Sequence, residues 1–166
     1  MNFTEFGQKL GALPAGKERT GAVARALSKF FRVPTEDIGI FSFDAEKQLI
    51  RFLWPPKLES FGFLPLSSPD SLAAKTLREN KAYLNNRFAS TIHPSIFEKV
   101  KLDKESEEPP LPVQKIISVP LQVNGEKSGV VQICRKGANA NEADADFTKD
   151  DLATMMEIAK AIAPHL

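Results

Sequence analysis

Two pairs of β-prone segments and the amphipathic helices around them predict an α+β fold, in which one mostly antiparallel sheet carries helices. Segments 38–43 and 48–54 form the first pair and are joined by a short polar turn. Segments 115–123 and 128–136 form the second pair. Between them, Asn124-Gly125 favours a type I′ turn, which needs two positive φ angles. Connections this short join antiparallel neighbours, so we expect two hairpins in one sheet.

The N-terminal part of the chain predicts two helices. Residues 1–16 carry scattered Phe, Gly and Pro and favour only a short helix over 3–10. A clearer helix begins at Glu18, after which apolar residues recur at helical spacing on one face: Val23, Leu27, Phe30 and Phe31. Pro34 is expected to end this helix, because the residue before a proline is driven out of helical geometry.

The middle of the chain predicts short elements separated by turns. Segment 61–66 is apolar but interrupted by Gly and Pro, which suits an edge strand or a packed loop. Ser68 before Pro69 is a preferred helix start, and Asn80 is the expected left-handed end of that helix. A short strand over 82–84 follows.

Polar and charged residues dominate the next stretch of the chain. Residues 85–87 predict a polar turn, and 94–100 predict one or two turns of helix. Segment 103–112 combines charges with prolines, so we expect a surface loop there.

A capped helix is predicted at the end of the chain. Thr148 is its expected N-cap, with Asp151 three residues on, a variant of the capping box. The helix presents an apolar stripe made of Leu152, Met155, Met156, Ala159 and Ile162.

Three segments near the C-terminus together resemble GAF domains. They are the strand 116–121 with its Val-Pro-Leu step, the Gly-Val strand 129–133, and the Phe-Thr-X-X-Asp sequence over 147–151. The helix 71–77 and the strand 81–85 are similar to the middle of that family. The order and spacing of these segments carry the resemblance, which covers nearly all of the chain.

The resemblance implies a single domain over residues 1–166, in which 1–16 is the least defined part. It implies a six-stranded, mostly antiparallel sheet with terminal helices on one face and a middle helix and loops over the other. In the family, the terminal helices often pair with a second subunit. Its members sense cyclic nucleotides, tetrapyrroles, haem, amino acids and other small molecules, and for some members no ligand is known.

The face with the middle helix often encloses a ligand cavity in this family. In this chain, such a cavity is expected beneath residues 61–86 and the loop around His93. The candidate ligand-binding residues are Phe61, Phe63, Leu72, Thr76, Tyr83, Asn85, Asn86, Arg87 and His93. The amides and the guanidinium among them offer donors and acceptors for an anionic or amide-bearing ligand. The alternative is a polar turn with Asn in left-handed geometry and Arg87 in solvent.

A comparison with cyclic-nucleotide-binding members favours a structural interpretation of the C-terminal motif. Those members carry an Asn-Lys pair after the second hairpin strand, then Phe, three residues and Asp-Glu. Lys136, Phe147 and Asp151 match this pattern, whereas Arg135 and Leu152 depart from it. The matching residues suit a loop anchor (Phe147) and a helix cap (Asp151) that faces Lys136.

The sequence offers few residues for redox chemistry or metal binding. Bilin attachment and sulfoxide reduction would need a pocket cysteine, and the reductase needs several. Cys134 is the only cysteine and lies within a predicted strand, so we expect it to be packed, on a face that the sequence leaves open. His93 and His165 are far apart in sequence and are too few for a metal site. A haem bound by His93 is a minor alternative, and we expect no cofactor.

Composition excludes several other classes of protein. The formal charge of +1 comes from 22 basic and 21 acidic residues mixed along the chain, so no basic segment predicts nucleic-acid binding. No apolar run approaches the roughly 20 residues of a membrane span, and no signal peptide opens the chain. A single cysteine agrees with a reducing compartment, so we expect a cytoplasmic protein. The 12 Phe residues are expected mainly in the core, with some lining a pocket.

Two functional hypotheses follow, and enzymatic activity is a distant third because no nucleophile, base and orienting group can be assembled. In the first, the chain is a non-catalytic regulatory sensor. It binds a small molecule and signals through its terminal helices to an output domain such as an HD-type hydrolase, a cyclase, a phosphodiesterase or a kinase. In the second, it is a ligand-free dimerisation module. The chain ends within its final predicted helix, at residues 163–166, so we also expect it to be a fragment of a longer protein.

Overall fold

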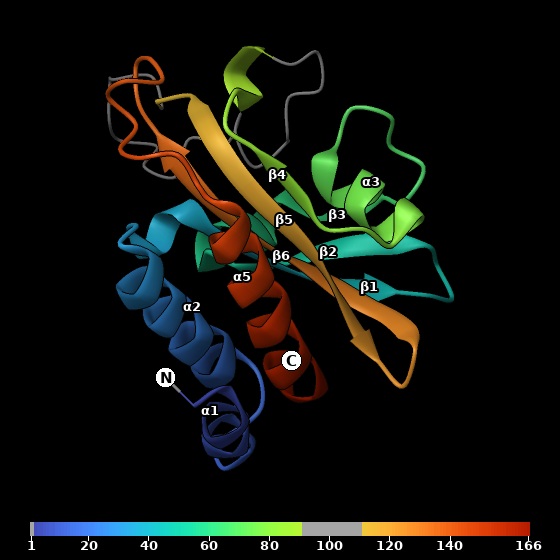
Figure 1. Ribbon diagram of the computed structural model, residues 1–166. Coiled ribbons are helices and arrows are strands. Elements are labelled where there is room, and N and C mark those ends of the chain that lie inside the picture. The colour runs from blue at the N-terminus through green and yellow to red at the C-terminus, as the bar shows by residue number, and fades with distance from the viewer. Residues whose placement is uncertain (1, 91–110) are drawn as a thin grey trace.

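A computed structural model describes residues 2–90 and 111–166 and shows a six-stranded antiparallel sheet (Figure 1). The strand order is β3-β2-β1-β6-β5-β4, and every neighbouring pair is antiparallel. The predicted fold class is therefore confirmed. The strands are β1 (Ile38–Asp44), β2 (Leu49–Trp54), β3 (Phe63–Pro65), β4 (Tyr83–Asn85), β5 (Val113–Val123) and β6 (Glu126–Lys136).

The helices form two layers, one on each face of this sheet (Figure 1). Three helices from the two ends of the chain cover one face: α1 (Phe3–Gly11), α2 (Lys17–Phe31) and α5 (Lys149–Ile162). The shorter helix α3 (Leu72–Glu79) lies over the other face. Short 3₁₀ turns complete the described elements: η1 (Thr35–Asp37), η2 (Pro56–Phe61), η3 (Phe88–Ser90) and η4 (Ala163–His165).

Alternation along the central strands gives the sheet two separate apolar cores. Ile117, Val131 and Ile133 pack with the terminal helices. Ile116 and Val130, their neighbours in sequence, pack with α3 on the opposite face. Successive side chains of a strand point to opposite faces, so strands covered by helices on both sides read as continuous apolar runs.

Local sequence signals placed several turns and caps correctly. Asn124 and Gly125 have φ angles of 53° and 78°, as the predicted type I′ turn requires. Thr148 and Asp151 form the predicted capping box, in which each side chain accepts a backbone N–H of the other residue. Asn80 ends α3 in the left-handed conformation, with φ 51°.

The predicted start of α3 is wrong, and the predicted apolar stripes of α2 and α5 are only partly buried. Ser71, not Ser68, is the N-cap of α3, because its Oγ accepts the N–H of Ala74 at 3.2 Å. Phe30, assigned to the apolar face of α2, is 41% exposed. The α2 helix ends at Phe31, before Pro34 is reached, because the next residue, Arg32, adopts the left-handed conformation with φ 56°.

Three earlier predictions concern residues that the structure does not describe. The helix over 94–100, most of the loop over 103–112 and the candidate ligand residue His93 all lie outside the described residues.

Candidate functional site

A cavity of about 420 Å³ lies between α3 and β4. Its lining includes Phe88 of η3, which follows β4 after a short turn. The cavity is lined by Pro69, Ser71, Leu72, Lys75, Arg78, Glu79, Tyr83, Leu84, Asn85 and Phe88. Its volume falls in the lower part of the range of small-molecule sites, and its lining mixes apolar and polar groups as such sites do.

Helical periodicity decides which side chains of α3 reach the cavity. Leu72, Lys75 and Arg78 recur every three residues and so share one flank of the helix. Ala73, Ala74 and Leu77 lie on the other side and are buried against the sheet. The cavity therefore lies along the flank of α3 that faces the edge strand β4.

Three of the nine candidate residues named from the sequence line this cavity: Leu72, Tyr83 and Asn85. Thr76 lies on α3 but is fully buried, and its Oγ1 is 2.7 Å from the Oγ of Ser118 on β5. It anchors the helix to the sheet and does not line the cavity.

Asn86 and Arg87 also lie away from the cavity lining. Asn86 bonds to the loop before α5, and Arg87 is an exposed residue whose N–H donates to Oδ1 of Asn85 at 2.8 Å. Neither Asn85 nor Asn86 has a positive φ angle, so left-handed geometry for these residues, the alternative interpretation of this turn, is wrong.

Phe61 and Phe63 lie apart from the cavity as well. Phe61 is 46% exposed and Phe63 is 55% exposed. Phe63 lies on the edge strand β3, and the guanidinium carbon of Arg51 is 4.7 Å from its ring centroid. In this strand only Leu64 is buried, because neighbouring residues of a strand point to opposite faces.

The space directly beneath α3 is filled by side chains. Leu77 and Ala74 pack there against Ile116, Val130 and Phe41. The cavity therefore lies along the flank of α3 and not directly beneath it. Cys134 belongs to the same cluster, so its side chain is fully buried on the α3 face of the sheet.

A small polar network interrupts this apolar layer. The Oγ of Ser118 contacts Thr76 and accepts a hydrogen bond from Nε2 of Gln132 at 3.1 Å. All three residues are fully buried. Oε1 of Gln132 has no hydrogen-bond partner among the described residues. An unsatisfied buried acceptor is costly, and this one lies in the polar network that contacts α3.

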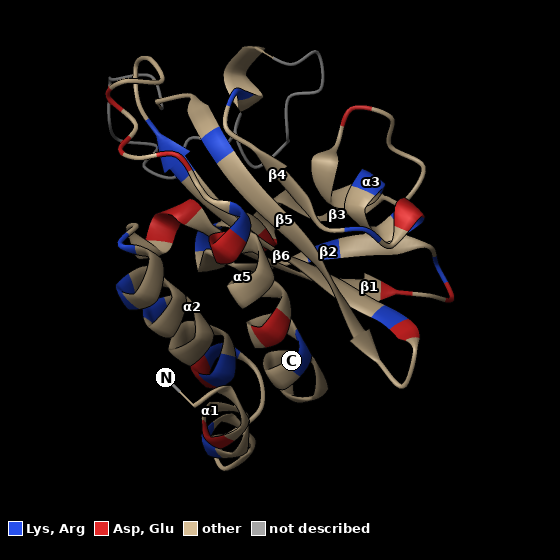
Figure 2. Ribbon diagram, viewed as in Figure 1, with Lys and Arg blue, Asp and Glu red and all other residues tan. Residues whose placement is uncertain are grey.

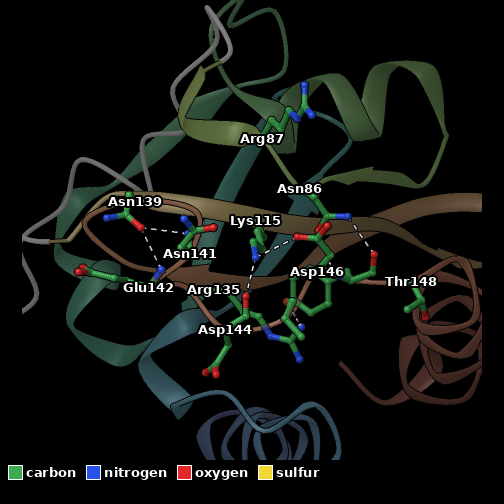
Figure 3. Close-up of polar contacts among 12 residues, drawn as sticks. Asn86, Arg87, Lys115, Arg135, Asn139, Asn141, Glu142, Asp144, Asp146 and Thr148 are labelled. Carbon is green, nitrogen blue, oxygen red and sulfur yellow. Dashed lines mark hydrogen bonds and ion pairs between the residues drawn. The ribbon is translucent and has the colours of Figure 1, made fainter.

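On the opposite side of β4, polar residues hold the loop before α5 (Figure 3). Asn86 uses both ends of its amide on one residue of this loop. Its Nδ2 donates to the carbonyl oxygen of Phe147 at 2.9 Å, and its Oδ1 accepts the N–H of Phe147 at 2.9 Å. Phe147 directly precedes Thr148, the N-cap of α5. The chain segment after β4 is thus tied to the start of the last helix.

Two basic residues of the sheet hold the same loop. Lys115 of β5 is only 4% exposed, and its Nζ donates to the carbonyl oxygen of Asp144 and lies 2.9 Å from Oδ1 of Asp146. Arg135 of β6 donates to the carbonyl oxygen of Ala145 at 2.6 Å and lies over the Phe147 ring, 4.2 Å from its centroid. Each residue from 144 to 147 therefore contacts a polar side chain of β5, of β6 or of the turn after β4.

Arg135 and Lys136 also join this end of the sheet to other parts of the fold. Arg135 donates to the carbonyl oxygen of Phe31, the last residue of α2, at 3.0 Å. Lys136 pairs with Asp37 at 3.2 Å. Burial raises the pKa of Asp37 above its ordinary value, and the nearby Lys136 ammonium acts in the opposite direction.

The residues that match the cyclic-nucleotide motif have structural contacts in this chain. Phe147 is buried and anchors the loop, Asp151 completes the capping box, and Lys136 pairs with Asp37. The structural interpretation of Phe147 and Asp151 agrees with these contacts.

Sequence reasoning missed Lys75 and Phe88, which line the cavity. Nζ of Lys75 lies 5.1 Å from the ring centroid of Tyr83. The helical spacing from Leu72 was the available signal for Lys75. Phe88 carried none, because the turn that brings it back over the cavity is defined only by tertiary contacts.

The sequence matches no protein-family model, and a search of curated proteins finds no match. Solved structures do match. The GAF domain of a phosphoenolpyruvate-protein phosphotransferase from Coxiella burnetii is 14% identical, with a TM-score of 0.71, over 98% of this chain and 89% of that one. The chain has the GAF-domain fold.

Two further structures with this fold belong to proteins of different description. A free methionine-R-sulfoxide reductase from Neisseria meningitidis, solved with its substrate, is 12% identical with a TM-score of 0.67, over 98% of this chain and 84% of that one. A GAF domain/HD domain protein from Geobacter sulfurreducens is 18% identical with a TM-score of 0.58, over 88% and 90%. At these identities the likeness establishes the fold and leaves activity to the residues of this chain.

Two further properties of the described residues are the distribution of their charges and the length of their helices. Basic and acidic residues are interspersed on helices and strands of the described part of the chain (Figure 2). Within residues 2–90 and 111–166, no helix has the length and apolar character needed to cross a bilayer.

Proposed function

We propose that this chain is a regulatory sensor domain that binds a small molecule in the cavity between α3 and β4 and transmits binding to α5. One observation carries the proposal. Strand β4 contributes Tyr83, Leu84 and Asn85 to the cavity, and the next residue, Asn86, holds Phe147 at the start of α5. A single residue, Asn86, thus connects the cavity-lining strand β4 to the residue before the N-cap of α5.

This connection gives a physical route for a signal. A ligand shifts an equilibrium between two arrangements only by the difference in its affinity for them. A ligand that contacts Tyr83 and Asn85 differently in two positions of β4 would also favour one position of Asn86. Because both amide ends of Asn86 are bonded to Phe147, movement of β4 changes the environment of the α5 N-cap.

A compound screen tests whether the cavity is a receptor. We expect nucleotides, amino acids or organic acids in such a screen to raise the melting temperature and to shift the amide resonances of residues 83–85. Leu72→Trp fills the cavity from α3 and should abolish binding. Phe63→Trp is the matched control, because the exposed Phe63 does not line the cavity. Absence of any stabilising compound would favour the ligand-free dimerisation module instead.

The proposal includes the absence of catalysis. Reduction of a sulfoxide to a thioether takes two electrons, which thiols supply by forming a sulfenic acid and then a disulfide with a second thiol. This chain has one cysteine, Cys134, which is 0% exposed and lies in the apolar layer beneath α3. We expect no methionine to form from free methionine sulfoxide and dithiothreitol in the presence of this protein. Methionine formation that is lost in Cys134→Ser would contradict a non-catalytic role.

The terminal helices are the proposed route to an output and to a second subunit. Phe30 of α2 and Met156 of α5 are 41% and 42% exposed on the helical face. Met156 also lines a groove of about 210 Å³ with Pro120 and Lys160. We expect a homodimer that sedimentation resolves and that Met156→Glu dissociates. An unchanged sedimentation coefficient in that variant would place Met156 outside the interface.

An HD-type hydrolase, a cyclase or a kinase remains the proposed class of output, attached or associated. The Geobacter sulfurreducens protein with this fold is described as a GAF domain/HD domain protein, which supports the first of these. A cytoplasmic location completes the proposal, supported by the single buried cysteine.

A further inference from the structure

We infer that the cavity between α3 and β4 selects a small organic anion with an apolar or aromatic body, and that Lys75 binds its charged group. This inference rests on the proposed sensor function and adds the chemical class of the ligand. Four observations support it: the position of the charges, the donors left without partners, the apolar part of the lining, and the volume.

The charged groups of the cavity differ in burial. Lys75 is half-buried, whereas Arg78 and Glu79 are exposed at the rim. The two rim charges have opposite signs and offset each other. Among the described lining residues, Lys75 is therefore the one charge away from the rim, and solvent screens its charge less than it screens the rim charges.

Lys75 makes no ion pair within the described part of the chain. Its recorded contact is with the face of the Tyr83 ring, 5.1 Å from Nζ to the ring centroid. A cation–π contact orients an ammonium group and leaves its N–H donors available to an anion. The ring of Tyr83 thus holds the lysine beside the cavity without neutralising it.

The uncharged polar groups of the lining are mainly available as donors. Oδ1 of Asn85 already accepts the N–H of Arg87, which leaves its amide N–H groups without a partner among the described residues. Oγ of Ser71 already accepts the N–H of Ala74, which leaves its O–H to donate. Together with Lys75, these groups favour a ligand that accepts hydrogen bonds, such as a carboxylate.

The rest of the lining is apolar and limits the ligand's size. Leu72 and Phe88 are buried, and with Leu84 and the Tyr83 ring they offer a surface for an aliphatic or aromatic group. A cavity of about 420 Å³ suits a small molecule of this kind rather than an extended polyanion.

Three probes with one common body test the charge preference. They are 3-phenylpropionate, 3-phenylpropanamide and 3-phenylpropylamine, which present an anion, a neutral amide and a cation on the same phenyl chain. Each is titrated into isotopically labelled protein while amide resonances of residues 71–88 are followed. We expect 3-phenylpropionate to bind at least about tenfold more tightly than the amide, and the amine to bind least.

Two lysine variants separate the role of Lys75 from a general charge effect. Lys75→Met keeps the length of the side chain and removes the ammonium. Lys57→Met changes the net charge equally, at an exposed lysine of η2 that does not line the cavity. We expect Lys75→Met to weaken 3-phenylpropionate about tenfold and to leave the amide's affinity unchanged, and Lys57→Met to change neither.

The outcomes distinguish this inference from the sensor function itself. Equal or tighter binding of the amide or amine, with shifts at Tyr83 and Asn85, would overturn the anion preference while leaving the cavity a receptor. Equal affinities of Lys75→Met and wild type for 3-phenylpropionate would overturn the role of Lys75. Failure of all three probes overturns the inferred ligand class, and the sensor function then stands or falls by the broader compound screen.

Discussion

The two faces of the sheet hold their helices in different ways. On one face, α5 packs its buried Met155, Ile158 and Ile162 into a core shared with α1 and α2, and polar side chains of β5, β6 and the turn after β4 hold the loop before it. On the other face, α3 has eight residues, a buried side-chain hydrogen bond to the sheet through Thr76, and a cavity along its flank. In the proposed function, the ligand moves the short helix beside the cavity, and the longer helix α5 carries the movement outward.

The proposed link between the two faces is a single residue, Asn86. Asn86 follows the cavity strand β4 and bonds to the residue before the N-cap of α5. A region that opens easily and a region that opens only on global unfolding differ in local stability. The four predictions below test that difference, in order of decreasing expected effect.

The first prediction contrasts the two cores. Ile158→Ala in α5 should lower the free energy of unfolding by about 3 kcal/mol, because it removes a fully enclosed side chain from the larger core. Leu77→Ala removes a similar side chain beneath α3. In hydrogen exchange, Leu77→Ala should expose α3 and β4 while α5 stays protected, whereas Ile158→Ala should speed exchange throughout. Equal, global effects of the two variants would show that α3 is no less firmly held than α5.

The second prediction concerns the link itself. Asn86→Ala removes two hydrogen bonds to Phe147 and should cost about 2 kcal/mol in unfolding free energy, with faster exchange in the first turn of α5. Asn139→Ala is the matched control. Its Oδ1 also accepts two backbone N–H groups, those of Asn141 and Glu142, but these bonds are exposed and stay within one loop. We expect that variant to change stability by less than about 0.5 kcal/mol.

The third prediction tests the polar attachment of α3. Thr76→Val keeps the shape of the side chain and removes its hydrogen bond to Ser118, so it should cost about 1 kcal/mol. Thr76→Ser keeps the hydroxyl and serves as the control for that bond. Chemical denaturation measures both. A Thr76→Val variant as stable as wild type would mean that Gln132 alone satisfies Ser118.

The fourth and smallest effect is a pH dependence at Asp37. Burial raises the pKa of this carboxyl above the ordinary 3.8, with Lys136 opposing the shift. The folded protein therefore keeps the proton to a higher pH than the unfolded chain does. The stability that this group contributes is fully present below 3.8 and is lost as the pH rises through the folded-state pKa.

Carboxyl NMR titration measures the Asp37 shift directly. Lys136→Met should move the Asp37 midpoint higher still, because it removes the opposing positive charge. Asp37→Asn should remove this part of the pH dependence of unfolding, while Asp150→Asn, an equal change of charge at an exposed site, should leave it in place. A midpoint at or below 3.8 would contradict the effect of burial.

Features set by a few neighbouring residues could be predicted from the sequence. The Asn124-Gly125 turn, the Thr148 and Asp151 capping box and the end of α3 at Asn80 each depend on contacts within a few positions. The start of α3 could not be decided in this way, because Ser68 and Ser71 are both acceptable N-caps. Packing of Leu72, Ala73 and Leu77 selects Ser71.

The candidate site was only partly predictable for the same reason. Tyr83, Asn85 and Leu72 line the cavity as expected of them, but the neighbouring Asn86 points to the opposite side and bonds a loop 61 positions away. Phe61 and Phe63 are aromatic residues of the kind that line pockets, but both are exposed, and Phe63 lies on the edge strand β3. Sequence shows which residues are suited to a site, whereas long-range packing decides which of them share one.

The most direct test of the link between cavity and helix is hydrogen exchange with and without the tightest-binding compound from the screen. In wild-type protein, binding should slow exchange at residues 83–85 and in the first turn of α5 together. In Asn86→Ala, binding should still slow exchange at residues 83–85 but leave α5 unchanged. Protection of the cavity strand with no change at α5 in the wild-type protein would contradict the account.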